Sequence, residues 1–162
     1  MPMKVRKSLA VLAWFFIIGG IILTLENYNI IGGISKNWPV MLIMLGVGFA
    51  MLFFQIQRDA ALAWISSFLV MNGFFFYYLN YHSWMDLSYL WPIFLGLVGM
   101  SFFISGLLTR KWVLSYIAVF FVIIFLALFL AFTISIRLWP MSLVMFGLSL
   151  LVIELFPGRK ER

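Results

Sequence analysis

The sequence predicts an all-α integral membrane protein that crosses a lipid bilayer six times. Three observations lead to this prediction: the chain is 65% hydrophobic and only 10% charged, its apolar residues form six long runs, and its charges lie in short clusters between those runs. A soluble domain carries about 25% charged residues because its surface meets water. The runs show no period-two alternation, and a helix satisfies its own backbone hydrogen bonds in lipid. We therefore expect helices that face hydrocarbon.

Each run is close to the roughly 20 residues that cross about 30 Å of hydrocarbon as a helix. The runs cover residues 8–25, 39–56, 60–80, 90–108, 112–134 and 138–156. The first run follows Lys4, Arg6 and Lys7, as the apolar part of a secretory signal does. It ends in Leu25-Glu26-Asn27-Tyr28 without a small-residue cleavage pattern, so we interpret it as a retained span.

Lysine and arginine fall mainly on one side of the predicted membrane. With the N-terminus inside, nine lie in inner segments and two in outer segments. The inner residues are Lys4, Arg6, Lys7, Arg58, Arg110, Lys111, Arg159, Lys160 and Arg162, and the outer ones are Lys36 and Arg137. Tryptophans near the run starts supply two aromatic belts: Trp14, Trp64 and Trp112 inside, and Trp38, Trp91 and Trp139 outside. This positive-inside bias predicts a protein of the cytoplasmic (inner) membrane with both termini in the cytoplasm.

The inner basic clusters predict contact with anionic membrane lipids, because each cation near such a surface gains on the order of 1 kcal/mol. They could also dock an acidic partner. Since the charges lie between apolar runs, we expect no nucleic-acid partner.

A short motif occurs three times and predicts a threefold internal repeat. The motif W-P-x6-G-x-[GS] comprises Trp38, Pro39, Gly46 and Gly48; Trp91, Pro92, Gly99 and Ser101; and Trp139, Pro140, Gly147 and Ser149. A shift of 53 residues also aligns Gly20 with Gly73 and Asn27-Tyr28 with Asn80-Tyr81, and a shift of 48 aligns Trp64 with Trp112. We predict one transmembrane domain, 1–162, made of hairpin repeats at about 8–56, 60–108 and 112–156.

Each part of the motif has a structural purpose. Proline suits the first helical position because its missing N–H would be unpaired there, and tryptophan sits well at the headgroup level. Small residues let membrane helices approach closely. The two small residues of the motif lie eight and ten residues after its tryptophan, which places them about 200° apart around the helix axis. We therefore expect other helices to approach each Trp-Pro helix closely on two sides. We expect the three Trp-Pro helices to form an inner contact set, and the alternative is packing in chain order.

Few residues could carry chemistry. Helix interiors contain no charge near mid-bilayer, and Glu154 is best interpreted as a headgroup-level carboxylate paired with Arg159 or Arg58. His82, Ser83 and Asp86 contain the residue types of a hydrolytic triad or of two metal ligands, but neighbours in sequence rarely reach triad geometry and two ligands are too few for a zinc site. Cysteine is absent. We expect no catalytic residue, cofactor or metal.

Asn72 is the one amide deep in a span. We expect it to hydrogen-bond across to another helix, and the alternative is that it lines a polar interior that binds a ligand.

The repeated W-P-x6-G element, carried by Trp38, Pro39 and Gly46 and their equivalents, resembles the transmembrane region of bacterial LiaF/LiaI-type cell-envelope stress proteins. The resemblance implies an accessory or inhibitory partner of membrane sensor kinases. Many family members carry a soluble domain after the helices, and here the sequence ends at Arg162. No functional residue carries over.

These observations favour a non-enzymatic membrane protein that acts through helix or lipid contacts, as an accessory or regulatory subunit in the envelope stress response. Its partner would be another membrane protein or a second copy. The alternative is a carrier or channel for a small molecule or lipid. A polar cavity lined by Asn72, Ser101, Ser105 or Ser149 would favour transport, and a dry interior with an exposed small-residue groove would favour partner binding.

Overall fold

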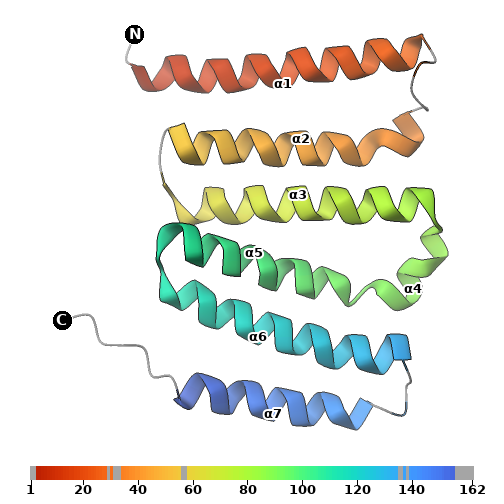
Figure 1. Cartoon of the computed structure of the whole chain (residues 1–162), viewed down its shortest axis with the longest axis vertical. Helices are drawn as coiled ribbons and strands as arrows, with labels where there is room; N and C mark the ends of the chain where they lie inside the picture. Colours follow the sequence, from red (N-terminus) through yellow and green to blue (C-terminus); the bar gives the residue numbers. More distant parts are fainter. Residues whose placement is uncertain are drawn as a thin grey trace. The chain divides into compact units, whose positions relative to one another are not determined.

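The computed structural model describes residues 3–28, 30, 34–55, 58–134, 137 and 139–155. Every regular element in these ranges is a helix, and they contain no strand. The chain divides into two compact units, Met1–Trp84 and Met85–Arg162. The elements are labelled in Figure 1.

The first unit contains α1 (Met3–Asn27), α2 (Ile34–Gln55) and α3 (Ala60–Tyr81). The helices pack side by side in chain order, α1 on α2 and α2 on α3, and the α2/α3 contact is the more extensive (Figure 1). Asp59 caps the start of α3, where its Oδ1 accepts a hydrogen bond from the Ala61 N–H at 3.3 Å. α2 and α3 form an antiparallel pair (Figure 1).

The second unit follows the short helix η1 (Trp84–Asp86) and contains α4 (Leu87–Leu90), α5 (Ile93–Thr109), α6 (Trp112–Phe129), the π-helical turn η2 (Leu130–Ile134) and α7 (Trp139–Leu155). α5 and α6 are joined by a tight turn in which Arg110 adopts a left-handed conformation with φ of 56°, and its N–H bonds to the Gly106 carbonyl. α6 packs against α5 and against α7 (Figure 1).

Several helices are long and apolar enough to span a membrane, as a membrane protein requires. In the described residues, Lys36–Gln55, Ala60–Tyr81 and Trp112–Thr133 meet both requirements, and the last two of these, 22 residues long, reach about 33 Å. The segments Trp84–Leu90 and Ile93–Thr109 are bent by 71° at Trp91-Pro92 and make a fourth span if they cross together. Shorter apolar stretches occur at Phe16–Asn27 and Trp139–Leu148.

The prolines do not all begin helices as the sequence predicted. Pro140 is the second residue of α7, and Pro92 directly precedes α5, so both lie at a helix start. Pro39 instead lies inside α2, which begins five residues earlier at Ile34. Pro39 is the sixth residue of α2, beyond the first four N–H groups that lack an intrahelical partner, so α2 accommodates it in its second turn at the loss of one backbone hydrogen bond.

The helices of each unit pack in chain order, as in the alternative arrangement. The prediction that the Trp-Pro helices form an inner contact set is wrong for α5 and α7, because α6 lies between them and packs on both (Figure 1). The Trp-Pro helix instead pairs with the helix that follows it, α2 with α3 and α5 with α6.

Candidate helix-contact site

The motif glycine of α2 lies at a close contact between α2 and α3. A Cβ atom built at Gly46 would lie 2.6 Å from Val70 Cγ2 and 2.9 Å from both the Ser66 carbonyl oxygen and the Val70 nitrogen. Two of these three atoms belong to the backbone of α3, which a side-chain rotation cannot move. Gly46 is buried, and a side chain at this position would have to push the two helices apart.

The two helices also meet at a glycine on α3. A Cβ at Gly73 would clash with Ile43 Cγ1 and would lie 3.0 Å from the Ile43 nitrogen and the Pro39 carbonyl oxygen. The Ile43 side chain therefore packs directly on the backbone of α3. Gly46 and Gly73 act as a reciprocal pair, since each helix offers one glycine to the other.

The α5/α6 pair has a contact equivalent to that of Gly46. A Cβ at Gly99 would lie 3.0 Å from Val122 Cγ2 and 3.1 Å from the Ala118 carbonyl oxygen. A valine Cγ2 and a backbone carbonyl oxygen also lie close to Gly46, whereas the third near atom at Gly99 is Phe121 Cβ. Ala118 and Val122 lie 52 positions after Ser66 and Val70. The motif glycine thus has the same role in both helix pairs.

The second contact is also present in α5/α6, but the residue sizes are exchanged. The position equivalent to Ile43 is Gly96, and the position equivalent to Gly73 is Phe125. A Cβ at Gly96 would lie 3.0 to 3.2 Å from three ring atoms of Phe125. In one pair a large residue on the first helix packs on a glycine of the second, and in the other pair the order is reversed.

One cross-helix hydrogen bond also occurs in both pairs. Asn80 donates from Nδ2 to the Lys36 carbonyl at 3.0 Å, and Thr133 donates from Oγ1 to the Tyr89 carbonyl at 3.1 Å. Both bonds span 44 residues, and both acceptors lie two residues before the motif tryptophan. A carbonyl oxygen can accept a second bond, so the bond is compatible with the helix ladder.

The π-helical turn explains why Thr133 takes this position. Up to Phe125 the equivalent residues of α3 and α6 are 52 apart, whereas Asn80 and Thr133 are 53 apart. A π-bulge adds one residue to a helix, and the π-helical turn begins at Leu130, after Phe125, and contains Thr133. The extra residue restores the register.

Aromatic rings surround the Asn80 bond. Trp84 donates from Nε1 to Asn80 Oδ1 at 2.8 Å and stacks on Phe76, with ring centroids 5.9 Å apart. The ring centroid of the motif residue Trp38 lies 5.1 Å from that of Phe76 and 6.3 Å from that of Trp84. The Asn80 amide is therefore held on both sides, by a backbone carbonyl and by an indole N–H.

We expect Asn80→Ala to weaken the α2/α3 pair by about 1 kcal/mol, because two interhelical or capping hydrogen bonds are lost and such bonds average about 0.6 kcal/mol in membrane proteins. Unfolding in mixed micelles, followed by tryptophan fluorescence, measures the change. Asn80→Asp is the matched control: it keeps an acceptor for Trp84 but loses the donor to Lys36, so an intermediate loss is expected. Equal stability of Asn80→Ala and the parent chain would contradict the importance of this bond.

Two of the polar residues considered as the lining of an interior cavity, Asn72 and Ser101, bond within their own helices. Asn72 is buried, and its Nδ2 donates to the Phe68 carbonyl of α3 at 2.8 Å. The expected bond from Asn72 to another helix is therefore wrong. Ser101 is fully buried and donates to the Leu97 carbonyl at 2.7 Å, and Ser105 is equally buried. The side chain of Ser149 lies outside the described part of the chain.

The remaining polar candidates lie at the surface. His82 follows the end of α3, stacks on Tyr78 with ring centroids 4.1 Å apart, and places Nδ1 3.2 Å from the Tyr78 carbonyl. Asp86 ends η1, and the described residues contain no cluster of three metal-ligating side chains. Glu154 is exposed on α7, and its proposed partner Arg159 lies outside the described residues.

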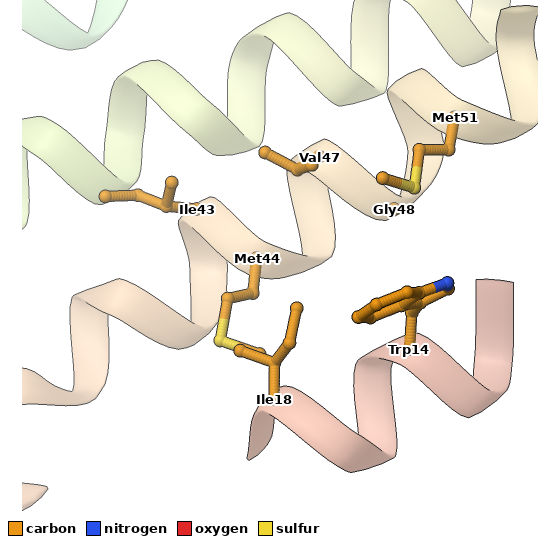
Figure 2. A pocket seen from close by; sticks show the side chains of 7 residues that line it. All are labelled: Trp14, Ile18, Ile43, Met44, Val47, Gly48 and Met51. Atoms are coloured by element: carbon orange, nitrogen blue, oxygen red, sulfur yellow. The ribbon is translucent and has the colours of Figure 1, made fainter. Parts of the chain in front are cut away.

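An apolar groove of about 150 Å³ lies between α1 and α2. Trp14 and Ile18 project from α1 toward α2 (Figure 2). The α2 side is formed by Ile43, Met44, Val47, Gly48 and Met51. The motif residue Gly48 thus lies on the α1 side of α2, while Gly46 contacts α3. A close approach to α2 is therefore shown on the α3 side, at Gly46, whereas Gly48 lines the groove on the α1 side.

The third copy of the motif differs from the other two. Trp139 and Pro140 are exposed at the start of α7. A Cβ atom built at Gly147 would have no atom within 4 Å, and the same holds for Gly20 of α1. Both glycines are exposed.

No family model, curated protein or solved structure matches the chain. Function is therefore inferred from the contacts themselves. The sequence pointed to the motif glycines and tryptophans, but not to Ile43, Phe125 or Thr133. Ile43 and Phe125 are ordinary apolar residues. Thr133 was missed because the sequence alignment of copies two and three matched Trp64 with Trp112, a shift of 48 residues. Asn80 and Thr133 are instead 53 residues apart.

Proposed function

We propose that this chain is a non-enzymatic membrane protein that acts through helix or lipid contacts, as an accessory or regulatory subunit. The observation that carries the proposal is the apolar groove between α1 and α2, which has no polar residue other than Trp14 in its lining. Such a groove fits an apolar side chain or an acyl chain. Its small residue, Gly48, permits a close approach.

The proposal places six spans in the cytoplasmic membrane, with both termini in the cytoplasm and the hairpins related as tandem repeats. The nine inner and two outer cations support this orientation. The recurring glycine contacts at Gly46 and Gly99 and the recurring bonds from Asn80 and Thr133 support a repeat. A role in the bacterial envelope stress response is proposed from the resemblance of the Trp-Pro element.

A carrier or channel is the second candidate, and the structure gives it less support. Asn72 and Ser101 are buried in helix contacts and donate to carbonyls of their own helices. The groove itself would suit a lipid chain better than a polar solute. A lipid carrier is therefore the form of this alternative that we retain.

We expect a benzophenone photocross-linker at Met44 to capture a membrane component, because Met44 lines the groove. Leu45 is the matched control: it is the next residue on α2, is 38% exposed, and does not line the groove. After irradiation of intact membranes, adducts at Met44 should exceed those at Leu45, and mass spectrometry distinguishes protein from lipid adducts. Equal labelling at the two positions would contradict a binding role for the groove. If the protein transported a lipid reporter in proteoliposomes, the lipid carrier would become the favoured function.

A further inference from the structure

We propose that the segment 85–91 lies in the lipid headgroup region at one surface of the membrane, where the π-helical turn η2 holds it. The inference rests on the membrane location proposed above and concerns a different part of the chain from the α1/α2 groove. The segment contains α4 and leads into α5 at Trp91-Pro92, where the chain bends by 71°. The segment, α5 and η2 all belong to the second unit.

The bend is not a general property of the Trp-Pro motif. α2 continues from Ile34 through Trp38-Pro39 as one helix, whereas the equivalent stretch of the second unit is divided into α4 and α5. The partner helices differ at the same place, because α3 is α-helical from Ala60 to Tyr81 and α6 leads into the π-helical turn η2. We therefore attribute the bend to the contact with η2 rather than to the proline alone.

Two side-chain contacts fasten the segment to η2. Thr133 donates from Oγ1 to the Tyr89 carbonyl at 3.1 Å, and the rings of Trp91 and Phe132 meet edge to face with centroids 5.3 Å apart. Phe132 and Thr133 both belong to η2. Because one contact is made to the backbone and the other to a ring beside the bend, together they fix the direction in which the segment leaves α5.

The bend keeps the segment at the level of the membrane surface. α5 has 17 residues and a length of about 26 Å, which is at the lower end of the range for a transmembrane helix. The headgroup region is about 5–7 Å thick on each side of the hydrocarbon. With the 71° bend, Met85 lies about 3 Å beyond Trp91 along the α5 axis, whereas in a straight helix it would lie about 9 Å beyond. The bent segment therefore fits within the headgroup region, and a straight one would project into water.

The side chains of the segment suit this location. Met85, Tyr89 and Trp91 are 83%, 41% and 37% exposed, and tyrosine and tryptophan favour the membrane–water interface because each ring has an apolar body and a polar tip. Asp86 is the one charged residue of the segment. Its attraction to the membrane therefore comes from the aromatic rings and not from pairing with anionic headgroups, so a bilayer of zwitterionic lipid should suffice.

Depth-dependent fluorescence quenching tests the location, because the absence of cysteine allows a single label in each chain. Met85→Cys and Met100→Cys chains are labelled with bimane and reconstituted in vesicles of dioleoyl phosphatidylcholine that contain a nitroxide quencher on the headgroup or near the acyl-chain end. Met100, an exposed residue of α5, is the matched control. We expect the headgroup quencher to be several-fold more effective than the acyl-chain quencher at position 85, and the reverse at position 100.

Three results at position 85 would overturn the proposal. Strong quenching by aqueous iodide with little quenching by either lipid would show a straight helix that projects into water. Preferential quenching by the acyl-chain nitroxide would place the segment inside the hydrocarbon, and protection from all the quenchers would show that protein covers it. Weak acyl-chain quenching at Met100 would instead contradict the membrane location itself. None of the results at position 85 alters the photocross-linking expected at Met44, so the two proposals fail separately.

A second variant tests the role of η2. Thr133→Val keeps the branched shape but cannot donate to the Tyr89 carbonyl, so iodide quenching at position 85 should rise about threefold, the factor expected for the loss of one interhelical hydrogen bond in a membrane. Thr109→Val is the matched control, because Thr109 donates to the Ser105 carbonyl of its own helix at 2.7 Å, and it should leave the quenching unchanged. Unchanged quenching in Thr133→Val, alone and combined with Phe132→Ala, would overturn the assignment of the bend to η2.

Discussion

Gly46→Ala should destabilise the α2/α3 pair by about 1–3 kcal/mol, the usual cost of forcing an extra methyl group into a packed interface. The new Cβ would lie 2.9 Å from both the Ser66 carbonyl oxygen and the Val70 nitrogen. Because these are backbone atoms, the helices must move apart along their whole contact rather than rotate a side chain. The neighbouring contact of Ile43 on Gly73 would loosen at the same time.

The same substitution at two other glycines provides a graded control. Gly99→Ala meets its closest atoms at 3.0 to 3.1 Å, so a smaller loss is expected than at Gly46. Gly19→Ala meets no atom within 4 Å and should gain up to about 1 kcal/mol from the better helix propensity of alanine. Unfolding in mixed micelles, monitored by tryptophan fluorescence, gives the three values. A loss at Gly19 equal to that at Gly46 would mean that glycine content, and not the α2/α3 contact, determines stability.

The sequence alone predicted the helical class and the approximate positions of the helices. The predicted runs at 60–80 and 112–134 agree with α3 and with α6 plus η2 to within one residue, because long apolar runs bounded by charge leave little choice of boundary. The start of α2 was predicted five residues late, at Pro39 instead of Ile34. Pro39 lies in the second turn of α2, so a proline does not by itself mark the first residue of a helix.

The contact partners were harder to predict than the contacting residues. A small residue shows that a helix is approached closely but not which helix approaches, so the motif glycines were assigned to one another instead of to α3 and α6. The exchange of Ile43 and Gly73 for Gly96 and Phe125 keeps the combined shape of the contact but changes both identities. A position-by-position comparison of the two helix pairs counts these two positions as mismatches. The bond of Asn72 to its own helix was not predictable either, because a buried amide can satisfy itself locally or across an interface.

Placing the large residue at position 96 and glycine at position 125 should preserve the packing of α5 on α6, if the Gly96/Phe125 contact is equivalent to the Ile43/Gly73 contact. Gly96→Ile alone should cost about 1–3 kcal/mol, because its side chain would enter the space of the Phe125 ring. Phe125→Gly alone should cost about 3–5 kcal/mol or more, because it leaves a cavity opposite Gly96. The double variant recreates the Ile43/Gly73 contact, in which the large residue belongs to the first helix. It should be more stable than Phe125→Gly alone, with a favourable coupling of about 1–3 kcal/mol.

The matched control for this exchange combines Gly96→Ile with Phe129→Gly. Phe129 lies one turn beyond Phe125 and contacts its ring at a centroid distance of 5.4 Å, but it is not among the nearest atoms to Gly96. Coupling in this control pair should therefore be small. Additive losses in the Gly96/Phe125 cycle, to within about 0.5 kcal/mol, would show that the two contacts are not interchangeable.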